Sequence, residues 1–295
     1  MISVCIPVYN FDVTDLVNAL LLQLEGTSEI ILVDDASTEK FQQINRTLAS
    51  SKVKLIELEK NVGRAKIRNL FLEYAHNPYL IFLDCDAKII STNYLLNYRT
   101  LLNKNIQVVC GGSIYSEKLP SSQQVLRWKY GRLRESKPAK VRSLSSYSSF
   151  MTSNFMIKKS LFEEIQFDER IVLYGHEDTL FGIDLEENNI SIKHIDNPVQ
   201  NDDVDSNDVF IKKTELALMS LTQIHSFYSG KERLEKHISL IRVASKIRRM
   251  KVEWLFSFFF FLFGGALKKH LLRSKNPSLN IFNLYKLGYY LGLKR

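Results

Sequence analysis

The sequence predicts an α/β protein with a mostly parallel central sheet flanked by helices, followed by a helical C-terminal extension. Over the first 112 residues, short runs rich in β-branched and aromatic residues alternate with stretches of helical periodicity. Strands that alternate with helices usually pair in parallel, because each helix returns the chain across the sheet. From about residue 208 onward the pattern is helical to the end of the sequence.

The elements are expected in a regular order along the chain. Strands are predicted at residues 2–8, 29–35, 52–58, 79–84 and 106–112, and helices at 14–24, 38–49, 64–75 and 92–103. Residues 113–150 carry eight Lys and Arg and a Ser-rich run, which predicts a partly helical excursion. Regular structure resumes with a strand and short helix at 152–165, a helix at 174–189 and a strand at 190–195.

The charge is unevenly distributed. Residues 231–295 hold 15 Lys and Arg against 3 Asp and Glu, a net charge of +12, so residues 1–230 carry −4 of the total of +8. We therefore expect a mildly acidic domain over 1–230, which includes the excursion 113–150, and a basic helical extension over 231–295. A basic extension could meet nucleic acid, anionic lipid or an acidic substrate, and charge alone does not choose among these.

The first residues and the cysteines indicate the compartment. Residues 1–6 enter a strand-like run without a basic n-region or a cleavage-site pattern, so no secretory signal is expected. Cys5, Cys85 and Cys110 are widely spaced, which predicts reduced, mostly buried thiols. The expected location is cytoplasmic.

One segment of the extension, WLFSFFFFLFGGAL at 254–267, has no charged residue and is apolar around its whole circumference. As a helix it would be about 21 Å long, shorter than the roughly 30 Å hydrocarbon core of a bilayer. Basic residues flank it on both sides, namely Lys246, Arg248, Arg249, Lys251, Lys268, Lys269 and Arg273. A core helix rarely has both flanks so basic, so we favour a segment lying in the interface of an anionic membrane over a buried helix.

Two carboxylates follow the strand at 79–84. Asp84 and Asp86 should emerge at the carboxyl end of this strand, where open α/β sheets bind ligands, and together they can share one cation. Carboxylates with open coordination positions suit Mg²⁺ or Mn²⁺, which then take phosphate oxygens as further ligands. The alternative is a strand-ending acidic turn, and alone the motif is weak.

Other strand ends carry candidate groups for binding a nucleotide. Asp35 follows the second strand, where a carboxylate can accept a hydrogen bond from an imide or a ribose hydroxyl, although either it or Asp34 could simply cap the next helix. Pro7 and Tyr9 leave the first strand, and the ring of Tyr9 could stack on a base or pack in the fold.

The helix that begins near residue 64 has three cations in its first turns. Arg64, Lys66 and Arg68 oppose the preference set by the helix dipole, so their number suggests an anion nearby. Gly63 permits a turn before the helix, and Asn61 precedes it.

Taken together, PVYN, VDDAS, NVG followed by KIRN, and FLDCD resemble, in order and spacing, the nucleotide-sugar domain of family 2 inverting glycosyltransferases of the GT-A fold, which has a Rossmann-like sheet. The later stretches LRWKYGRLRE, SNFMIKK, YGHEDTLFG, HIDNPV and FIKKTE resemble one bacterial branch of that family. The resemblance covers roughly residues 1–230.

The resemblance implies roles for the donor site. Asp35 would hold the base and Tyr9 would stack on it, with Pro7 beside it. Asn61 and Arg68 would line the nucleotide site, Asp84 would meet the ribose or the metal, and Asp86 would ligate Mn²⁺ or Mg²⁺. The expected donor is a nucleotide diphosphate sugar, with UDP favoured by resemblance alone.

It also implies a general base. Glu177 and Asp178 open a helix, and the family places its base in such an acidic pair, which we assign to Asp178. His194 is a candidate third metal ligand, although a lone histidine there is more often structural. The branch carries a histidine where this chain has Asn201, which predicts weaker metal binding.

The expected function is an inverting glycosyl transfer to a glycan or lipid-linked acceptor at the inner face of the cytoplasmic membrane, with no nucleic-acid partner. Two alternatives remain, a sugar nucleotidyltransferase and a non-catalytic protein that binds a nucleotide or lipid. The first lacks the expected Gly-rich phosphate loop after strand one, and no zinc spacing or nucleic-acid motif supports the second. The donor sugar, the acceptor, the linkage and the oligomeric state are open.

Overall fold

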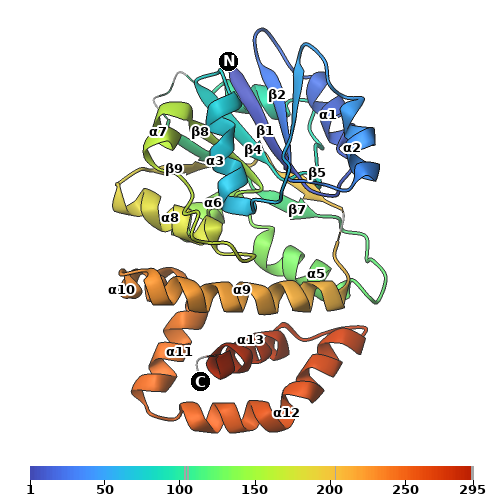
Figure 1. Ribbon diagram of the computed structural model, residues 1–295. Coiled ribbons are helices and arrows are strands. Elements are labelled where there is room, and N and C mark those ends of the chain that lie inside the picture. The colour runs from blue at the N-terminus through green and yellow to red at the C-terminus, as the bar shows by residue number, and fades with distance from the viewer. Residues whose placement is uncertain (103, 105, 203, 294–295) are drawn as a thin grey trace. The chain divides into compact units, whose positions relative to one another are not determined.

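The computed structural model describes residues 1–102, 104, 106–202 and 204–293 (Figure 1). These residues fall into two compact units. The first contains residues 1–116, 135–170 and the stretch from Glu177 to just before Val204, and the second contains 117–134, 171–176 and the chain from Val204 onward. The boundary expected at residue 230 falls inside the second unit.

The first unit is built on a sheet with the strand order β3-β2-β1-β4-β8-β6-β9. Strands β1 to β4 pair in parallel, whereas β8 lies antiparallel between β4 and β6. The prediction of a mostly parallel sheet is therefore confirmed. The bounds are β1 (Ile2–Val8), β2 (Glu29–Asp34), β3 (Val53–Glu57), β4 (Tyr79–Leu83), β6 (Val108–Cys110), β8 (Asn154–Lys158) and β9 (Ile192–His194).

Helices cover both faces of this sheet (Figure 1). Alternate residues of β1 point to opposite faces, so Val4 and Ile6 join one buried cluster and Cys5 joins the other. The first cluster includes residues of α1 and α4, and the second includes residues of α3, α7 and α8. These helices are α1 (Thr14–Leu21), α2 (Glu39–Arg46), α3 (Arg64–Tyr74), α4 (Tyr94–Arg99), α7 (Lys159–Glu164) and α8 (Glu177–Glu187).

A second, small sheet joins three distant parts of the chain. Strand β10 (Val199–Asn201) pairs antiparallel with β5 (Ala87–Lys88) and parallel with β7 (Ser113–Tyr115). The register places Asn201 opposite Ala87, the residue after Asp86. Strands of two or three residues carry no periodic pattern, and we did not predict this sheet from the sequence.

The excursion expected at 113–150 is partly helical. It contains α5 (Val125–Tyr130), a π-helix (Gly131–Glu135), α6 (Ala139–Arg142) and two 3₁₀ turns (Ser143–Ser145 and Tyr147–Ser149). The part that belongs to the first unit is held by Arg142, whose buried guanidinium donates hydrogen bonds to the carbonyls of Cys110, Gly111 and Ile195. This arginine thus has a structural role.

The second unit is helical. Its members are α5, α9 (Asn207–Phe227), α10 (Lys231–His237), α11 (Ser239–Arg249), α12 (Glu253–Arg273) and α13 (Leu279–Leu293). Leu126, Ile211, Leu271 and Phe282, which come from α5, α9, α12 and α13, share one buried cluster. Helix α5, from the middle of the sequence, is therefore part of the same core as the C-terminal helices.

Helix α12 is longer than the apolar segment expected at 254–267. It has 21 residues, its most apolar window has a mean hydropathy of 1.4, and 17% of that window is buried. By length and composition alone this helix could cross a membrane, so the argument that the segment is too short to span does not hold for the whole helix. A core helix of a soluble protein can meet the same two criteria, although such a helix is mostly buried.

Candidate functional site

Three of the predicted site residues directly follow parallel strands of the first unit. Strand β1 ends before Tyr9, β2 before Asp35 and β4 before Asp84, and these strands are neighbours in the sheet. Their carboxyl ends therefore meet at one edge, where doubly wound sheets bind ligands. All these residues belong to the first unit.

Asp35 faces the loop that precedes α3. Its two carboxylate oxygens accept hydrogen bonds from the backbone N–H groups of Val62 at 2.7 Å and Gly63 at 3.2 Å. Gly63 has φ +85, a left-handed conformation that glycine adopts without the strain of a side chain. Burial raises the pKa of Asp35 although the two backbone hydrogen bonds oppose that shift. The Asn61 side-chain amide donates to the Asp35 carbonyl at 3.3 Å, so these residues form one wall.

The two carboxylates that end β2 have different surroundings. Asp34 is buried and accepts a hydrogen bond from the Ser37 N–H at 2.7 Å, so it holds the turn before α2, as one of our alternatives expected. The Ser37 hydroxyl in turn accepts from the Asn10 N–H at 2.7 Å, and Asn10 accepts from the Thr38 N–H at 2.8 Å. These bonds tie the loop after β1 to the loop after β2. Tyr9, beside this link, is 54% exposed and its ring is accessible.

Asp84 lies against two arginines of α3. Its carboxylate accepts a hydrogen bond from Arg68 at 2.7 Å and lies 3.5 Å from the guanidinium of Arg64. The Arg68 side chain is only 2% exposed, whereas that of Arg64 is 41% exposed. Arg68 is therefore a buried counter-ion of Asp84, and Arg64 is the more accessible of the two cations.

Cys85, between the two aspartates, is partly buried and packs against the first core cluster. Burial, together with the charges of Asp86 and Asp84, raises the pKa of its thiol to about 12. A thiol that stays protonated is a poor ligand for a hard cation.

The acidic pair at the start of α8 is joined to the same cluster. The Glu177 carboxylate accepts a hydrogen bond from Arg64 at 2.7 Å and lies 3.7 Å from Arg68. Burial raises the pKa of Glu177, but Arg64 and Arg68 outweigh that effect, so its pKa lies below the usual range. Arg64 therefore bridges Asp84, at the carboxyl ends of the parallel strands, and Glu177, next to Asp178.

Asp178 has the opposite shift. Burial and the neighbouring charge of Glu177 raise the pKa of Asp178 to about 6, although it accepts hydrogen bonds from the Thr179 N–H at 2.6 Å and the Thr179 hydroxyl at 3.2 Å. A carboxylate with this pKa is largely ionised at neutral pH and is a stronger base than an ordinary aspartate. The two acids are thus divided between an ion-pair partner and a candidate base.

The residues offer a limited set of metal ligands. Among the described residues, no group of three or more His, Cys, Asp and Glu is placed to hold a metal ion. Asp84 and Asp86 provide hard oxygen donors that fit Mg²⁺ or Mn²⁺, provided that substrate phosphates and water complete the coordination. Asn201 pairs with Ala87, so its backbone lies beside the residue that follows Asp86.

His194 has another role. Its Nδ1 lies 2.8 Å from Arg142, which can only donate, and its Nε2 lies 3.1 Å from the Ser146 carbonyl, which can only accept. The ring is therefore neutral with its proton on Nε2, and burial together with Arg142 lowers its pKa to about 4. Both ring nitrogens are engaged, which favours the structural interpretation over the metal ligand.

Comparison with known proteins agrees with this architecture. The model of the family described as glycosyl transferase family 2 matches residues 3–166, more than half of the chain. The chain belongs to glycosyl transferase family 2. The matched part includes Asp35, Asn61, Arg68, Asp84 and Asp86, and ends before Asp178.

Curated relatives from the family match only part of the chain. An uncharacterized glycosyltransferase of Haemophilus influenzae is 31% identical over 121 residues, which are 40% of this chain and 48% of that protein. The UDP-Glc:alpha-D-GlcNAc-diphosphoundecaprenol beta-1,3-glucosyltransferase WfgD of Escherichia coli is 26% identical over 113 residues, 38% of this chain and 45% of WfgD. The matches span less than half the length of these relatives.

Solved structures confirm the GT-A fold. TarS of S. aureus is 20% identical with a TM-score of 0.53, covering 100% of this chain and 92% of that one. The mannosyltransferase PcManGT of Pyrobaculum calidifontis, solved with GDP-Man and Mn²⁺, is 14% identical with a TM-score of 0.57, covering 98% and 84%.

The sequence interpretation missed the link between Arg64 and Glu177. We expected the cations of α3 to face an anionic ligand and gave Glu177 no role of its own. All three of these cations instead meet carboxylates of the protein, including Lys66, which lies 4.0 Å from Glu169. The signal was the unusual number of cations at a helix start. Glu177 lies 113 residues after Arg64 in the sequence, and no local pattern identifies it as the partner of Arg64.

Proposed function

We propose that this chain is an inverting glycosyltransferase that moves a sugar from a UDP-sugar to a hydroxyl group of a glycan or lipid-linked acceptor. The observation that carries the proposal is the chain of contacts from Asp84 through Arg64 to Glu177, which links the carboxylate edge of the sheet to Asp178. A donor site and a base with a raised pKa are thus joined within the first unit. Relatives support the substrate class, since TarS was solved with UDP-GlcNAc and WfgD is named for a UDP-Glc donor.

The donor lies at the ends of β1, β2 and β4. The base of the nucleotide stacks on the exposed ring of Tyr9, with Pro7 at the end of β1 beneath it, and hydrogen-bonds to Asp35. Asn61 and the Val62–Gly63 backbone hold Asp35 in place. Arg64, as the more exposed cation, meets the diphosphate, while Arg68 fixes Asp84.

Asp86 and Asp84 would hold a Mn²⁺ or Mg²⁺ ion, which would supply charge neutralisation for the diphosphate leaving group. PcManGT, solved with Mn²⁺, supports a divalent ion in this fold. The Asn201 side chain, rather than His194, is the candidate for an additional neutral ligand, because both nitrogens of His194 are engaged.

Transfer proceeds by in-line displacement. The ionised carboxylate of Asp178 takes the proton of the acceptor hydroxyl while its oxygen forms a bond to the anomeric carbon. The bond from that carbon to the diphosphate breaks on the opposite side, and UDP leaves with the electron pair. A single displacement of this kind inverts the configuration.

The acceptor is presented at a membrane surface, which we propose is the inner face of the cytoplasmic membrane. Helix α12 leaves large apolar side chains exposed, and basic residues precede the helix and occupy its last turns. Its opposite side packs on α13, and Lys268 near its end forms an ion pair with Glu215 of α9. A helix fixed to its own unit along one side fits the interface better than a span exposed to lipid all round.

Asp178→Asn tests the base. The amide keeps the size of the side chain but cannot accept a proton, so we expect UDP binding within twofold of wild type and a loss of transfer of about 10²- to 10⁴-fold. Product analysis by NMR would show inversion of the anomeric centre in the wild type. A variant that loses UDP binding, or one that transfers normally, would contradict the assigned role.

Ser substitutions at Phe258, Phe261 and Leu262 test the membrane surface, since these side chains are 58%, 83% and 54% exposed. We expect at least tenfold weaker binding to vesicles that contain phosphatidylglycerol. The matched control replaces Leu22 and Leu144, exposed by 90% and 83% on other elements, with Ser. Equal loss in both variants, or no loss in either, would refute the role of α12.

A further inference from the structure

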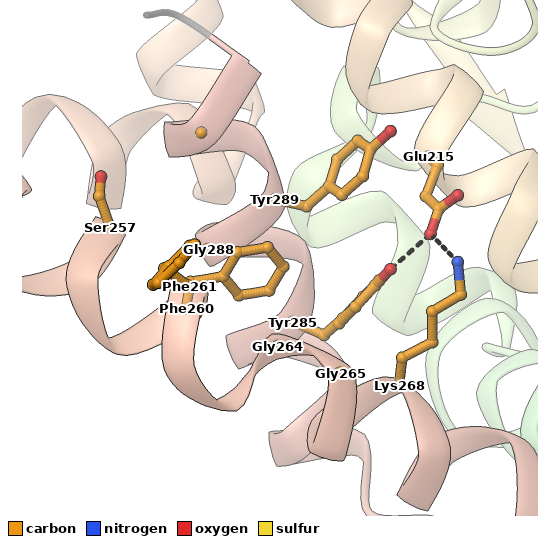
Figure 2. Close-up of a pocket in the computed structure, with 11 residues that line it drawn as sticks. Glu215, Ser257, Phe260, Phe261, Gly264, Gly265, Lys268, Tyr285, Gly288 and Tyr289 are labelled. Carbon is orange, nitrogen blue, oxygen red and sulfur yellow. Dashed lines mark hydrogen bonds and ion pairs between the residues drawn. The ribbon is translucent and has the colours of Figure 1, made fainter.

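The helical unit contains a groove that the proposed reaction does not use. It has a volume of about 500 Å³, within the range of about 300–1,000 Å³ that is usual for ligand pockets. Figure 2 shows its lining, which comes from α9, α12 and α13. No residue assigned above to the donor, the metal or the base is among them.

The groove runs along α12 between two polar ends (Figure 2). At one end Glu215 accepts hydrogen bonds from Lys268, at 2.7 Å, and from the Tyr285 hydroxyl. At the other end lies Ser257, whose buried hydroxyl has no hydrogen-bond partner among the described residues. Ser257 and Lys268 are 11 positions apart, or about 17 Å along a helix at ~1.5 Å per residue.

Glycines make the space between these ends. Gly264 and Gly288 have a packing reason, because a Cβ on either would lie 3.2 or 2.3 Å from the ring of Phe260. Gly265 and Gly292 have none, since a Cβ on either would meet nothing within 4 Å. Glycine is unfavourable inside helices, so two glycines that only border open space suggest that the space itself is used.

The groove is continuous with the apolar surface of α12. Phe261 lines the groove and is also 83% exposed, the largest exposed fraction among the aromatic side chains of this helix. The length of about 17 Å is close to half the thickness of the ~30 Å hydrocarbon core. One acyl chain spans this half, which is the apolar part of a single leaflet. The basic residues before this helix and in its last turns favour an anionic headgroup.

We propose that this groove binds one acyl chain of an anionic phospholipid. The chain lies along Phe260, Phe261 and the glycines, and an ester oxygen near the headgroup accepts a hydrogen bond from Ser257. The inference rests on the membrane-surface part of the proposed function. It adds a specific lipid site to a surface that could otherwise bind a bilayer through charge and exposed rings alone.

Leucine substitutions in the groove provide the test. Gly265→Leu and Gly292→Leu place side chains in the open space, and replacing a helix glycine should not lower the melting temperature. The probe is myristoyl lysophosphatidylglycerol, a single-chain anionic lipid, titrated below its micelle concentration into the full chain by calorimetry. We expect one molecule per wild-type chain and at least tenfold weaker binding to each variant.

Phe258→Ala is the control, because Phe258 is exposed on α12 but does not line the groove. It should bind the single-chain lipid like wild type while binding vesicles more weakly. The groove variants should show the reverse, with vesicle binding reduced less than binding of the single lipid. Failure of the wild type to bind vesicles would refute the proposal that α12 lies on a membrane. Loss of lysolipid binding alone would concern only the groove, so the two proposals can be tested separately.

Three results would overturn the groove proposal. The first is equal affinity of wild type, Gly265→Leu and Gly292→Leu for the lysolipid. The second is at least tenfold preference for farnesyl phosphate, which would assign the groove to an isoprenoid chain. The third is a concentration-dependent dimer of the wild type that Gly265→Leu abolishes, which would assign it to a second copy.

Discussion

The acid limb of the pH–rate profile should report the ionisation of Asp178. Because burial and Glu177 raise the pKa of this carboxyl to about 6, it is half ionised at that pH. A general base works only when ionised, so kcat/KM should be near its plateau at pH 7 and should fall about tenfold per pH unit below pH 6. An ordinary aspartate, whose pKa is about 3.9, would give no loss until far lower pH.

Glu177→Gln should move this limb in a known direction. The negative charge of Glu177 raises the pKa of Asp178, and this charge is absent in the variant. The positive charge of Arg64 lowers the pKa of Asp178, and in the variant Arg64 loses the carboxylate of Glu177 that neutralises its charge. Both effects favour the ionised form of Asp178 in the variant. The limb should therefore shift to lower pH, even if the plateau rate also falls because Arg64 is no longer held.

The assay is release of UDP from the UDP-sugar, measured directly by chromatography between pH 4.5 and 8, with water as acceptor until a better one is found. Asp184 gives a matched control, because burial and Asp168 also raise its pKa to about 6, on the same helix. Asp184→Asn should leave the limb in place. A limb that follows Asp184→Asn, or one that stays fixed in Glu177→Gln, would refute the assignment.

Three further predictions concern stability and the metal. Arg68→Met leaves Asp84 and Glu177 without a buried counter-ion, so the free energy of unfolding by urea should fall by about 3 kcal/mol. A loss below about 1 kcal/mol would show that the ion pairs of Arg68 are not buried in solution. Asp184→Asn should raise the free energy of unfolding by on the order of 1 kcal/mol at pH 8 and by progressively less toward pH 4. The reason is that the pKa of Asp184 is raised in the folded protein, so its ionised form, which destabilises the fold, is present only at higher pH. A change in stability that does not depend on pH would contradict this. His194→Gln should leave the Mn²⁺ dependence of UDP binding unchanged, and tenfold weaker Mn²⁺ use would restore the histidine as a ligand.

The parallel part of the sheet could be predicted from the sequence because each of its strands and helices has a recognisable local pattern of apolar residues. Buried runs such as β1 and β4 are continuous apolar stretches bounded by polar residues, and helices with their own periodicity separate them. The carboxylates at their ends therefore gather at one edge whatever the details of the loops. This is why Asp35 and Asp84 could be assigned in advance to the same edge of the sheet.

Other features depend on contacts between distant residues. The small sheet of β5, β7 and β10 consists of strands too short for a pattern, and the Arg64–Glu177 pair joins two separate helices. Helix α5 joins the C-terminal helices through Leu126, although its sequence lies between two parts of the first unit. The full length of α12 was also missed, because Lys268 and Lys269 end the apolar run but continue the helix.

The most direct test of the central claim is calorimetric titration of UDP into the purified chain with Mn²⁺, with EDTA, and with the Asp86→Ala variant. We predict binding of one UDP per chain in Mn²⁺, at least tenfold weaker binding in EDTA, and the same weak binding by Asp86→Ala in either condition. Absence of UDP binding by the wild type in both conditions would contradict a UDP-sugar site at the carboxylate edge of the sheet.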